Sequence, residues 1–134
     1  MASAIDTNRG IIRIPSNYSV IETMDRLDAS LKERGIKVFA RIDFSGDAER
    51  AGIPLRPEQM LIFGNPKAGT PLMVAVPSVG LDLPLKALAW EEPDGRIWIA
   101  YNDAKYIVDR HGLASDFAAN LSVVVPLIER AAGD

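Results

Sequence analysis

The fold of this 134-residue chain is decided by residues 61–103, whose sequence is LIFGNPKAGTPLMVAVPSVGLDLPLKALAWEEPDGRIWIAYND. Two stretches within it, LDLPLKALAWEE at 81–92 and RIWIAY at 96–101, have the composition of β-strands. Between them lies Glu92-Pro93-Asp94-Gly95, in which proline presets one turn residue and glycine permits positive φ. These features predict a β-hairpin.

The start of the same stretch predicts a strand, a loop and a short helix. The apolar run 60–63 has the length of a strand core, and the glycines and prolines of 64–69 then indicate a loop. Thr70 followed by Pro71 is typical of an N-cap and a first-turn proline, which predicts a helix over 71–76 that Pro77 ends.

Upstream, the pattern predicts strand, helix, strand and loop. An apolar run at 11–14 indicates a strand ended by Pro15. Ser19 and Glu22 form a capping box, and the apolar spacing behind them predicts a helix that Gly35 ends. Alternating apolar residues over 36–44 predict a half-buried strand, followed by a loop over 45–57 with at most one helical turn near 47–51.

Downstream, two more helices are expected, over 104–111 and over 115–132. Pro126 lies off the apolar face of the last helix, so we expect a kink there without termination. The whole order favours an α+β domain in two layers, with a mostly antiparallel sheet and helices packed on one face. Residues 1–134 are expected to form a single domain.

Composition excludes several classes of function. With 15 Lys and Arg against 18 Asp and Glu, the chain offers no basic surface for nucleic acid or for a membrane. It has no cysteine and one histidine, so we expect no disulfide, no metal site and no cofactor. The N-terminus lacks the pattern of a signal peptide and no apolar run is long enough to span a bilayer, which predicts a cytoplasmic protein.

The first candidate site is the loop that leads into the helix at Pro71. Unpaired amides of Leu72 and Met73, with Lys67 nearby, could hold a carboxylate or a phosphate. The alternative is that Asn65, Gly69 and Thr70 only build a tight turn, as such residues ordinarily do.

The second candidate pairs Asp82 with Lys86, which would share one face of a strand. Lys86 could then be a poised base, or the two residues could form an ordinary ion pair at the margin of the sheet. A third candidate is His111 as a general base, which would need a nucleophile such as Ser78 or Ser115 and an orienting acid. The alternative for His111 is contact with the last carbonyls of its own helix.

Several motifs resemble one known family. They are Phe63-Gly64-Asn65-Pro66-Lys67, Gly69-Thr70-Pro71-Leu72-Met73, Asp82-Leu83-Pro84-Leu85-Lys86, Trp90-Glu91, Asp94-Gly95, Trp98, Tyr101-Asn102 and Arg110-His111. Over about 18–113, the chain resembles the domain-of-unknown-function family 302. The resemblance implies a small bacterial or archaeal α+β domain, similar in layout to the TATA-binding-protein-like group, that tends to dimerise and has no established activity.

Together these observations predict a cytoplasmic homodimer that binds a small anionic ligand without catalysis. The predicted ligand residues are Asn65, Lys67, Thr70, Asp82 and Lys86. The alternative is a small hydrolase or isomerase that uses Lys86, Asp82 and His111 as acid and base. The dimer is expected to bury apolar side chains of the hairpin 81–101, because a sheet covered on one face only would expose them.

Overall fold

The computed structural model describes residues 4–6 and 9–133. Its six-stranded sheet has the order β1-β2-β6-β5-β4-β3, with antiparallel pairing between all neighbours. The strands are β1 (Ala4–Asp6), β2 (Ile11–Ser16), β3 (Lys37–Asp43), β4 (Glu58–Gly64), β5 (Leu85–Glu91) and β6 (Ile97–Asn102). The helices are α1 (Val20–Glu33), α2 (Phe44–Arg50), α3 (Pro66–Ala75), α4 (Ala104–Arg110), α5 (Ala118–Ser122) and α6 (Val125–Gly133), with the 3-10 helices η1 (Pro77–Asp82) and η2 (Ser115–Phe117). The predicted α+β class is confirmed.

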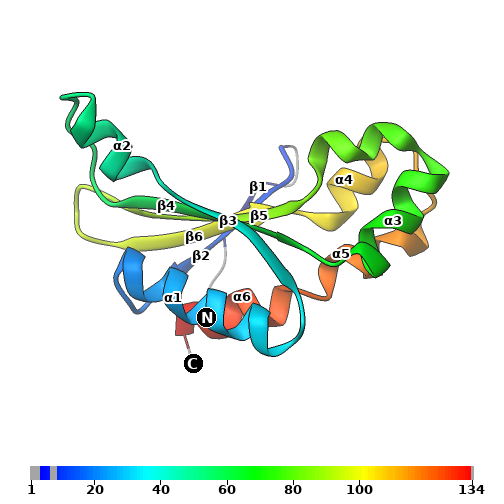
Figure 1. Cartoon of the computed structure of the whole chain (residues 1–134), viewed down its shortest axis with the longest axis horizontal. Helices are drawn as coiled ribbons and strands as arrows, with labels where there is room; N and C mark the ends of the chain where they lie inside the picture. The colour runs from blue at the N-terminus through cyan, green and yellow to red at the C-terminus, as the bar shows by residue number, and fades with distance from the viewer. Residues whose placement is uncertain (1–3, 7–8, 134) are drawn as a thin grey trace.

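Helices α1 and α6 lie side by side across one face of the sheet (Figure 1). Between the helices and the sheet lies a hydrophobic core, to which the strands contribute every second residue. These residues are Leu61 and Phe63 from β4, Ala87 and Ala89 from β5, and Ile99 from β6. Because side chains alternate across a strand, the residues between these point to the other face. The two layers are therefore one sheet and one helical pair.

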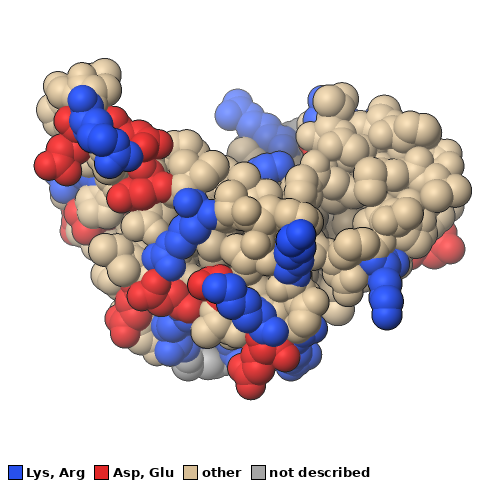
Figure 2. All heavy atoms as spheres, in the orientation of Figure 1, with Lys and Arg blue, Asp and Glu red and all other residues tan. Residues whose placement is uncertain are grey.

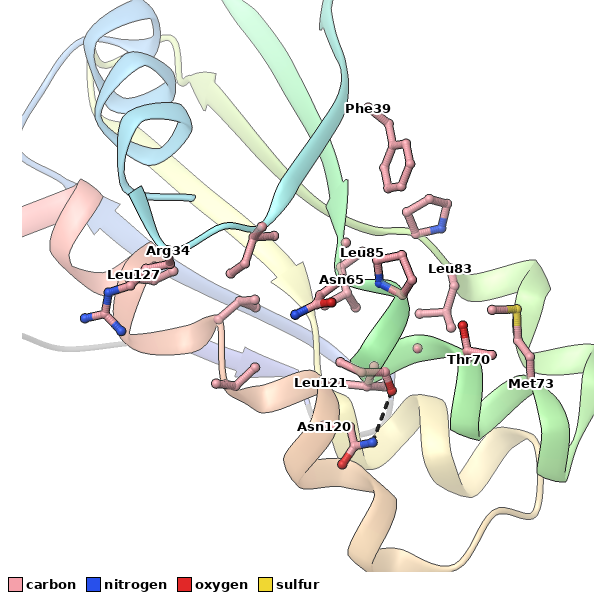
Figure 3. A pocket seen from close by; sticks show the side chains of 18 residues that line it. Arg34, Phe39, Asn65, Thr70, Met73, Leu83, Leu85, Asn120, Leu121 and Leu127 are labelled. Atoms are coloured by element: carbon pink, nitrogen blue, oxygen red, sulfur yellow. Dashed lines mark hydrogen bonds between the residues drawn. The ribbon is translucent and has the colours of Figure 1, made fainter. Parts of the chain in front are cut away.

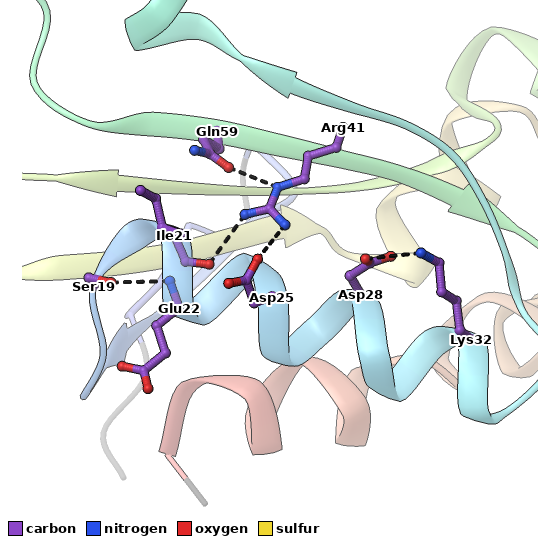
Figure 4. A network of polar contacts seen from close by, with 8 residues as sticks. All are labelled: Ser19, Ile21, Glu22, Asp25, Asp28, Lys32, Arg41 and Gln59. Carbon is purple, nitrogen blue, oxygen red and sulfur yellow. Dashed lines mark hydrogen bonds and ion pairs between the residues drawn. The ribbon is translucent and has the colours of Figure 1, made fainter.

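Polar contacts cap the beginning of α1 and join its N-terminal half to the sheet (Figure 4). The hydroxyl of Ser19 accepts the amide of Glu22 at 3.1 Å, which confirms the predicted N-cap. From β3, Arg41 reaches over the helix, where its guanidinium donates to Asp25 at 2.6 Å and to the Ile21 carbonyl at 3.3 Å. Its Nε also donates to Gln59 of β4 at 2.9 Å, so one arginine joins two strands to the helix.

A second core lies beyond the end of the sheet, where α3, η1, α4 and α5 form a helical lobe (Figure 1). Its buried residues are Leu72, Val79, Ile107, Val108, Leu113 and Leu121. The prediction of one kinked helix over 115–132 is wrong. Helix α5 ends at Ser122, before Pro126, and a new helix begins at Val125. A proline has no N–H to give to the preceding turn. The break allows α5 to join the lobe while α6 covers the sheet.

Three further element predictions need correction. Phe44 is not in the strand: Asp43 caps a seven-residue helix there through its carboxylate, which accepts the Gly46 amide at 3.0 Å. Helix α3 begins at Pro66, five residues earlier than predicted, and contains Pro71. The strand expected from Leu81 begins only at Leu85, because residues 77–82 form η1. Strand β1 was not predicted, since its three residues carry no alternation.

The other face of the sheet is open at its middle (Figure 1). It carries Met60, Leu88, Trp90, Trp98 and Ala100, which alternate with core residues along their strands and belong to neither buried cluster. Trp90 and Trp98 lie opposite each other on neighbouring strands. We call these residues the open sheet face.

Candidate functional site

A pocket of about 500 Å³ lies where the sheet meets the helical lobe (Figure 3). Its walls come from β3, from the beginning of α3, from the segment that leads into β5, and from α5 and α6. Most of the lining is apolar: Ile36, Phe39, Met73, Leu83, Leu85, Leu121, Val124 and Leu127. A pocket with apolar walls and a few polar groups is the usual form of a small-molecule site.

Three neutral polar side chains line this pocket. Asn65 uses its side-chain oxygen to accept the Lys67 amide at 3.0 Å, which leaves its NH₂ group without a bond among the described residues. Asn120 donates to the Ala68 carbonyl at 3.1 Å, and its own oxygen takes part in no bond to a described residue. Thr70 adds a hydroxyl. These groups supply donors and acceptors without a charge.

The beginning of α3 does not offer the anion site that the sequence predicted. The N-cap is Asn65, so Leu72 and Met73 lie inside the helix, where their amides are not end groups. The first turn is also satisfied: Pro66 has no N–H, and the amides of Ala68 and Gly69 donate to the Asn65 carbonyl at 2.9 and 3.0 Å. Thr70 is therefore not a cap, and an anion would find no free amide here.

Charge at the pocket comes from cations at its edge. Arg34 is the charged residue in the lining, and its guanidinium points away from the pocket in Figure 3. Lys37 lies with its ammonium 5.1 Å from the ring centroid of Phe39, and the exposed Lys67 follows Asn65. Neither Arg34 nor Lys67 pairs with an acid among the described residues. Figure 2 shows few charges over the lobe with α3 and α4, whereas charges gather over α1 and α2.

Of the five predicted ligand residues, Asn65 and Thr70 line the pocket, whereas Lys67, Asp82 and Lys86 do not. Asp82 belongs to η1 and Lys86 to β5, so no common strand face connects them, and the predicted pairing is wrong. Lys86 donates instead to the Pro84 carbonyl at 3.2 Å. Asp82 is bound by Arg110, whose Nη1 donates to both carboxylate oxygens at 3.0 and 3.1 Å.

His111 and Asp82 do converge, as the acid–base alternative required, but Lys86 does not join them. His111 Nε2 lies 2.5 Å from Asp82 Oδ2, and its Nδ1 lies 2.7 Å from the hydroxyl of Ser78. Of the two serines considered, the structure thus selects Ser78. Among the described residues, no group of His, Asp and Glu side chains is placed to hold a metal ion.

Sequence reasoning missed most of the pocket. Phe39 lies at a register shift between β3 and β4, which the alternation along the strand does not indicate. Asn120 and Val124 lie on either side of the break between α5 and α6, where the sequence pattern predicts one continuous helix. The signal that could have found them is Pro126, because the carbonyls and side chains one turn before a proline are commonly freed from the helix.

Comparison with known proteins bears on this fold and site. The family described as "Domain of unknown function DUF302" matches residues 12–128. The chain belongs to this family. A crystal structure of an uncharacterized conserved DUF302 protein from Bacillus stearothermophilus has the same fold, with a TM-score of 0.76 at 18% identity over 92% of this chain and 95% of that one.

Two curated relatives carry a functional name. The chain is 44% identical over 125 residues to "Fluoride-specific ion channel FluC 1" of Brucella suis biovar 1 (strain 1330), and equally to a protein of that name from Brucella abortus biovar 1 (strain 9-941). These matches cover 92% of this DUF302 chain but 48% and 46% of the relatives, so the chain spans about half of their length. None of the helices in the described part of this chain combines the length and the hydrophobicity that a span of the bilayer requires.

Proposed function

We propose that this DUF302 domain binds a small molecule with an apolar body and an anionic head, and does so without catalysis in the pocket. The carrying observation is the pocket of about 500 Å³, whose lining is apolar, contains no acidic side chain and has cations at its edge. Burying the body would contribute about 25 cal/mol for each Å² of apolar surface. The anionic head would remain in solvent at the edge of the pocket, where the positive charges of Lys67 and Lys37 attract it.

This proposal keeps three of the predicted ligand residues. Asn65 and Thr70 would bond the polar end of the ligand from the pocket wall. Lys67, which is exposed outside the lining two residues after Asn65, would face the charge of the ligand. Asp82 and Lys86 have no place in it, because Asp82 is bound by Arg110 and His111 and Lys86 donates to the Pro84 carbonyl. Pocket chemistry is also unsupported, since the lining holds no carboxylate, histidine or lysine that could act as acid or base.

The proposal is tested by thermal unfolding in the presence of octanoate, octanol and octyltrimethylammonium, which share a chain and differ in the charge of the head. Octanoate should raise the unfolding temperature most and the ammonium least. A concentration of about one hundred times Kd adds about 2.7 kcal/mol to the free energy of unfolding. Lys67→Gln should reduce the advantage of octanoate over octanol.

A matched pair of variants on α3 tests whether octanoate stabilises the protein by binding in the pocket. A Cβ at Gly69 would lie 3.5 Å from Leu83 Cδ1, and both residues line the pocket, so Gly69→Phe should occupy it and abolish stabilisation by octanoate. Val74→Phe adds the same ring on the exposed side of the helix, where Val74 is 79% exposed, and should leave binding intact. Equal stabilisation of both variants, or none of the unsubstituted protein, contradicts the proposal.

We further propose that two copies pair through the open sheet face. Leu88, Trp90 and Trp98 are half-buried in the single chain, and the pairing would bury the rest of their apolar surface. The same face carries Glu58, beside Trp90, and Arg13, beside Ala100. A two-fold axis would bring opposite charges of the two copies together at the rim.

Light scattering at micromolar concentration tests the dimer. The unsubstituted protein should have twice the mass of the chain, and Leu88→Lys should be a monomer because it places a charge in the interface. Val74→Lys, on the exposed side of α3, is the matched control and should remain a dimer. A monomeric mass that persists as concentration rises would rule out the pairing.

The named relatives favour a second candidate function, that of an accessory domain to a fluoride channel. At 44% identity the matched half of those proteins would share this fold, and the described part of this chain offers no membrane-spanning helix, so that half would not be the pore. Fluoride efflux from vesicles that hold the other half of the Brucella suis protein is the test. Addition of this chain should change the efflux rate, and an unchanged rate would reject this function.

A further inference from the structure

A chain of hydrogen bonds in the helical lobe remains outside the pocket and its proposed function. It runs from the hydroxyl of Ser78, in η1, to His111 at the end of α4, and returns to Asp82 at the other end of η1. The two distances, 2.7 and 2.5 Å, are within hydrogen-bond reach. Arg110 holds both oxygens of Asp82 from its outer side.

The position of Asp82 decides which nitrogen of His111 carries the proton. A carboxylate only accepts, so Nε2 must donate to it. Nδ1 of the neutral ring then has a free lone pair, which accepts the hydroxyl proton of Ser78. The serine is thus bonded to a base whose orientation is fixed by an acid, although the two ring nitrogens are used in the opposite order to that of chymotrypsin-type triads.

The side chains of Ser78, His111 and Asp82 differ in solvent exposure in the way that nucleophilic catalysis requires. The side chain of His111 is only 6% exposed and that of Asp82 18% exposed, so the base and the acid are shielded from competing water. Ser78 is exposed at the surface of the lobe. A substrate from solution can therefore reach the hydroxyl without displacing the groups behind it.

We propose that Ser78 is the nucleophile of an acyl-transfer site, with His111 as general base and Asp82 as the residue that orients it. The substrate class is an acyl ester, which can approach the exposed hydroxyl of Ser78 from solvent. This site is separate from the ligand pocket and does not depend on the binding proposed there.

The chemistry balances with these groups and water. Ser78 Oγ bonds to the acyl carbon while its proton passes to His111 Nδ1, and the leaving alkoxide takes that proton as its bond to carbon breaks. Water then attacks the acyl-serine and gives a proton to Nδ1. The acid departs, and Ser78 regains its proton from the histidine.

Covalent labelling with a fluorophosphonate tests the assignment on the full chain, with intact mass and peptide mapping as readouts. Ser78 should be labelled in the unsubstituted protein and not in Ser78→Ala, whereas Ser115→Ala, at another exposed serine, should be labelled at the normal rate. Asp82→Asn and His111→Gln should slow labelling about 100-fold or more, the usual contribution of a positioned base.

The opposing interpretation is that these bonds only join η1 to α4. In that case Ser78 would not be labelled, or would be labelled at the same rate in His111→Gln, and either result overturns the proposal. Asp82→Asn supplies the same test if His111→Gln does not fold. Gly69→Phe should keep full labelling while it loses octanoate binding, so failure of one site is distinguishable from failure of the other.

Discussion

Gly10 permits a quantitative test of how α4 is held against β2. Its φ is +71°, and an added Cβ would lie 2.2 Å from Cγ and 2.7 Å from Cβ of Tyr106. Carbon atoms normally approach no closer than about 3.5 Å. Rotation of the tyrosine ring cannot relieve the second contact, because the Cβ of Tyr106 does not move with its side chain. The backbone of β2 or α4 must shift instead.

Gly35 provides a matched control for the cost of this overlap. It also has a φ of +71°, but a Cβ there would meet no atom within 4 Å. Gly35→Ala should therefore lose only the cost of a left-handed residue, about 1–2 kcal/mol. Gly10→Ala should lose that amount plus about 1–3 kcal/mol for overpacking.

Urea unfolding of both variants, followed by circular dichroism, gives the two free energies. We expect the free energy of unfolding of Gly10→Ala to be lower than that of Gly35→Ala by about 1–3 kcal/mol, with an unchanged dependence on urea concentration. Equal losses would show that α4 does not pack on Gly10 as described, and would refute the reasoning.

Three further predictions concern single side chains. Burial raises the pKa of Tyr101 above 10.0, with smaller contributions from Glu129 and Asp103, so stability should fall as pH rises beyond about 10, and Tyr101→Phe should remove that slope in urea titrations. Gly69→Ala should stabilise the protein by up to about 1 kcal/mol, since Gly69 lies inside α3 and the new methyl makes an ordinary contact; a loss would contradict the helix assignment. Asn65→Ala should cost about 1 kcal/mol in the same assay, whereas Asn65→Asp should retain the cap.

Local signals predicted the elements whose ends are marked by side chains. The cap at Ser19, the turn at Gly95 and the alternation of β3 each depend on a few neighbouring residues, and each is where the sequence placed it. Gly95 has a φ of +87°, as the hairpin turn requires. Such features need no knowledge of distant contacts.

The errors occur where a local rule has two solutions. Thr70-Pro71 and Asn65-Pro66 are both good N-caps with a first-turn proline, and the structure uses the earlier one. That choice lets Leu72 enter the lobe core. Likewise, Asp82 satisfies a strand pattern, but its contacts with Arg110 and His111, 28 and 29 residues away, place it in η1. Where two local structures have equal intrinsic propensity, tertiary contacts decide which of them forms.

The pocket was the least predictable feature, because it forms between two cores. Phe39 enters it through an irregularity in strand pairing, and Val124 through the break before Pro126. The acid–base cluster was closer to prediction, since the sequence named His111, Ser78 and Asp82. The sequence could not join them, because η1 and α4 meet only in the folded lobe.

The most direct test of the ligand pocket is the spectrum of methionine methyl groups during a titration with octanoate. Met73 lines the pocket, Met24 is buried in the sheet core, and Met60 lies on the open sheet face. If octanoate binds in the pocket, the Met73 signal shifts and saturates while those of Met24 and Met60 remain in place. A saturable shift of Met60 with Met73 unchanged, or no shift at any concentration, would contradict binding in the pocket.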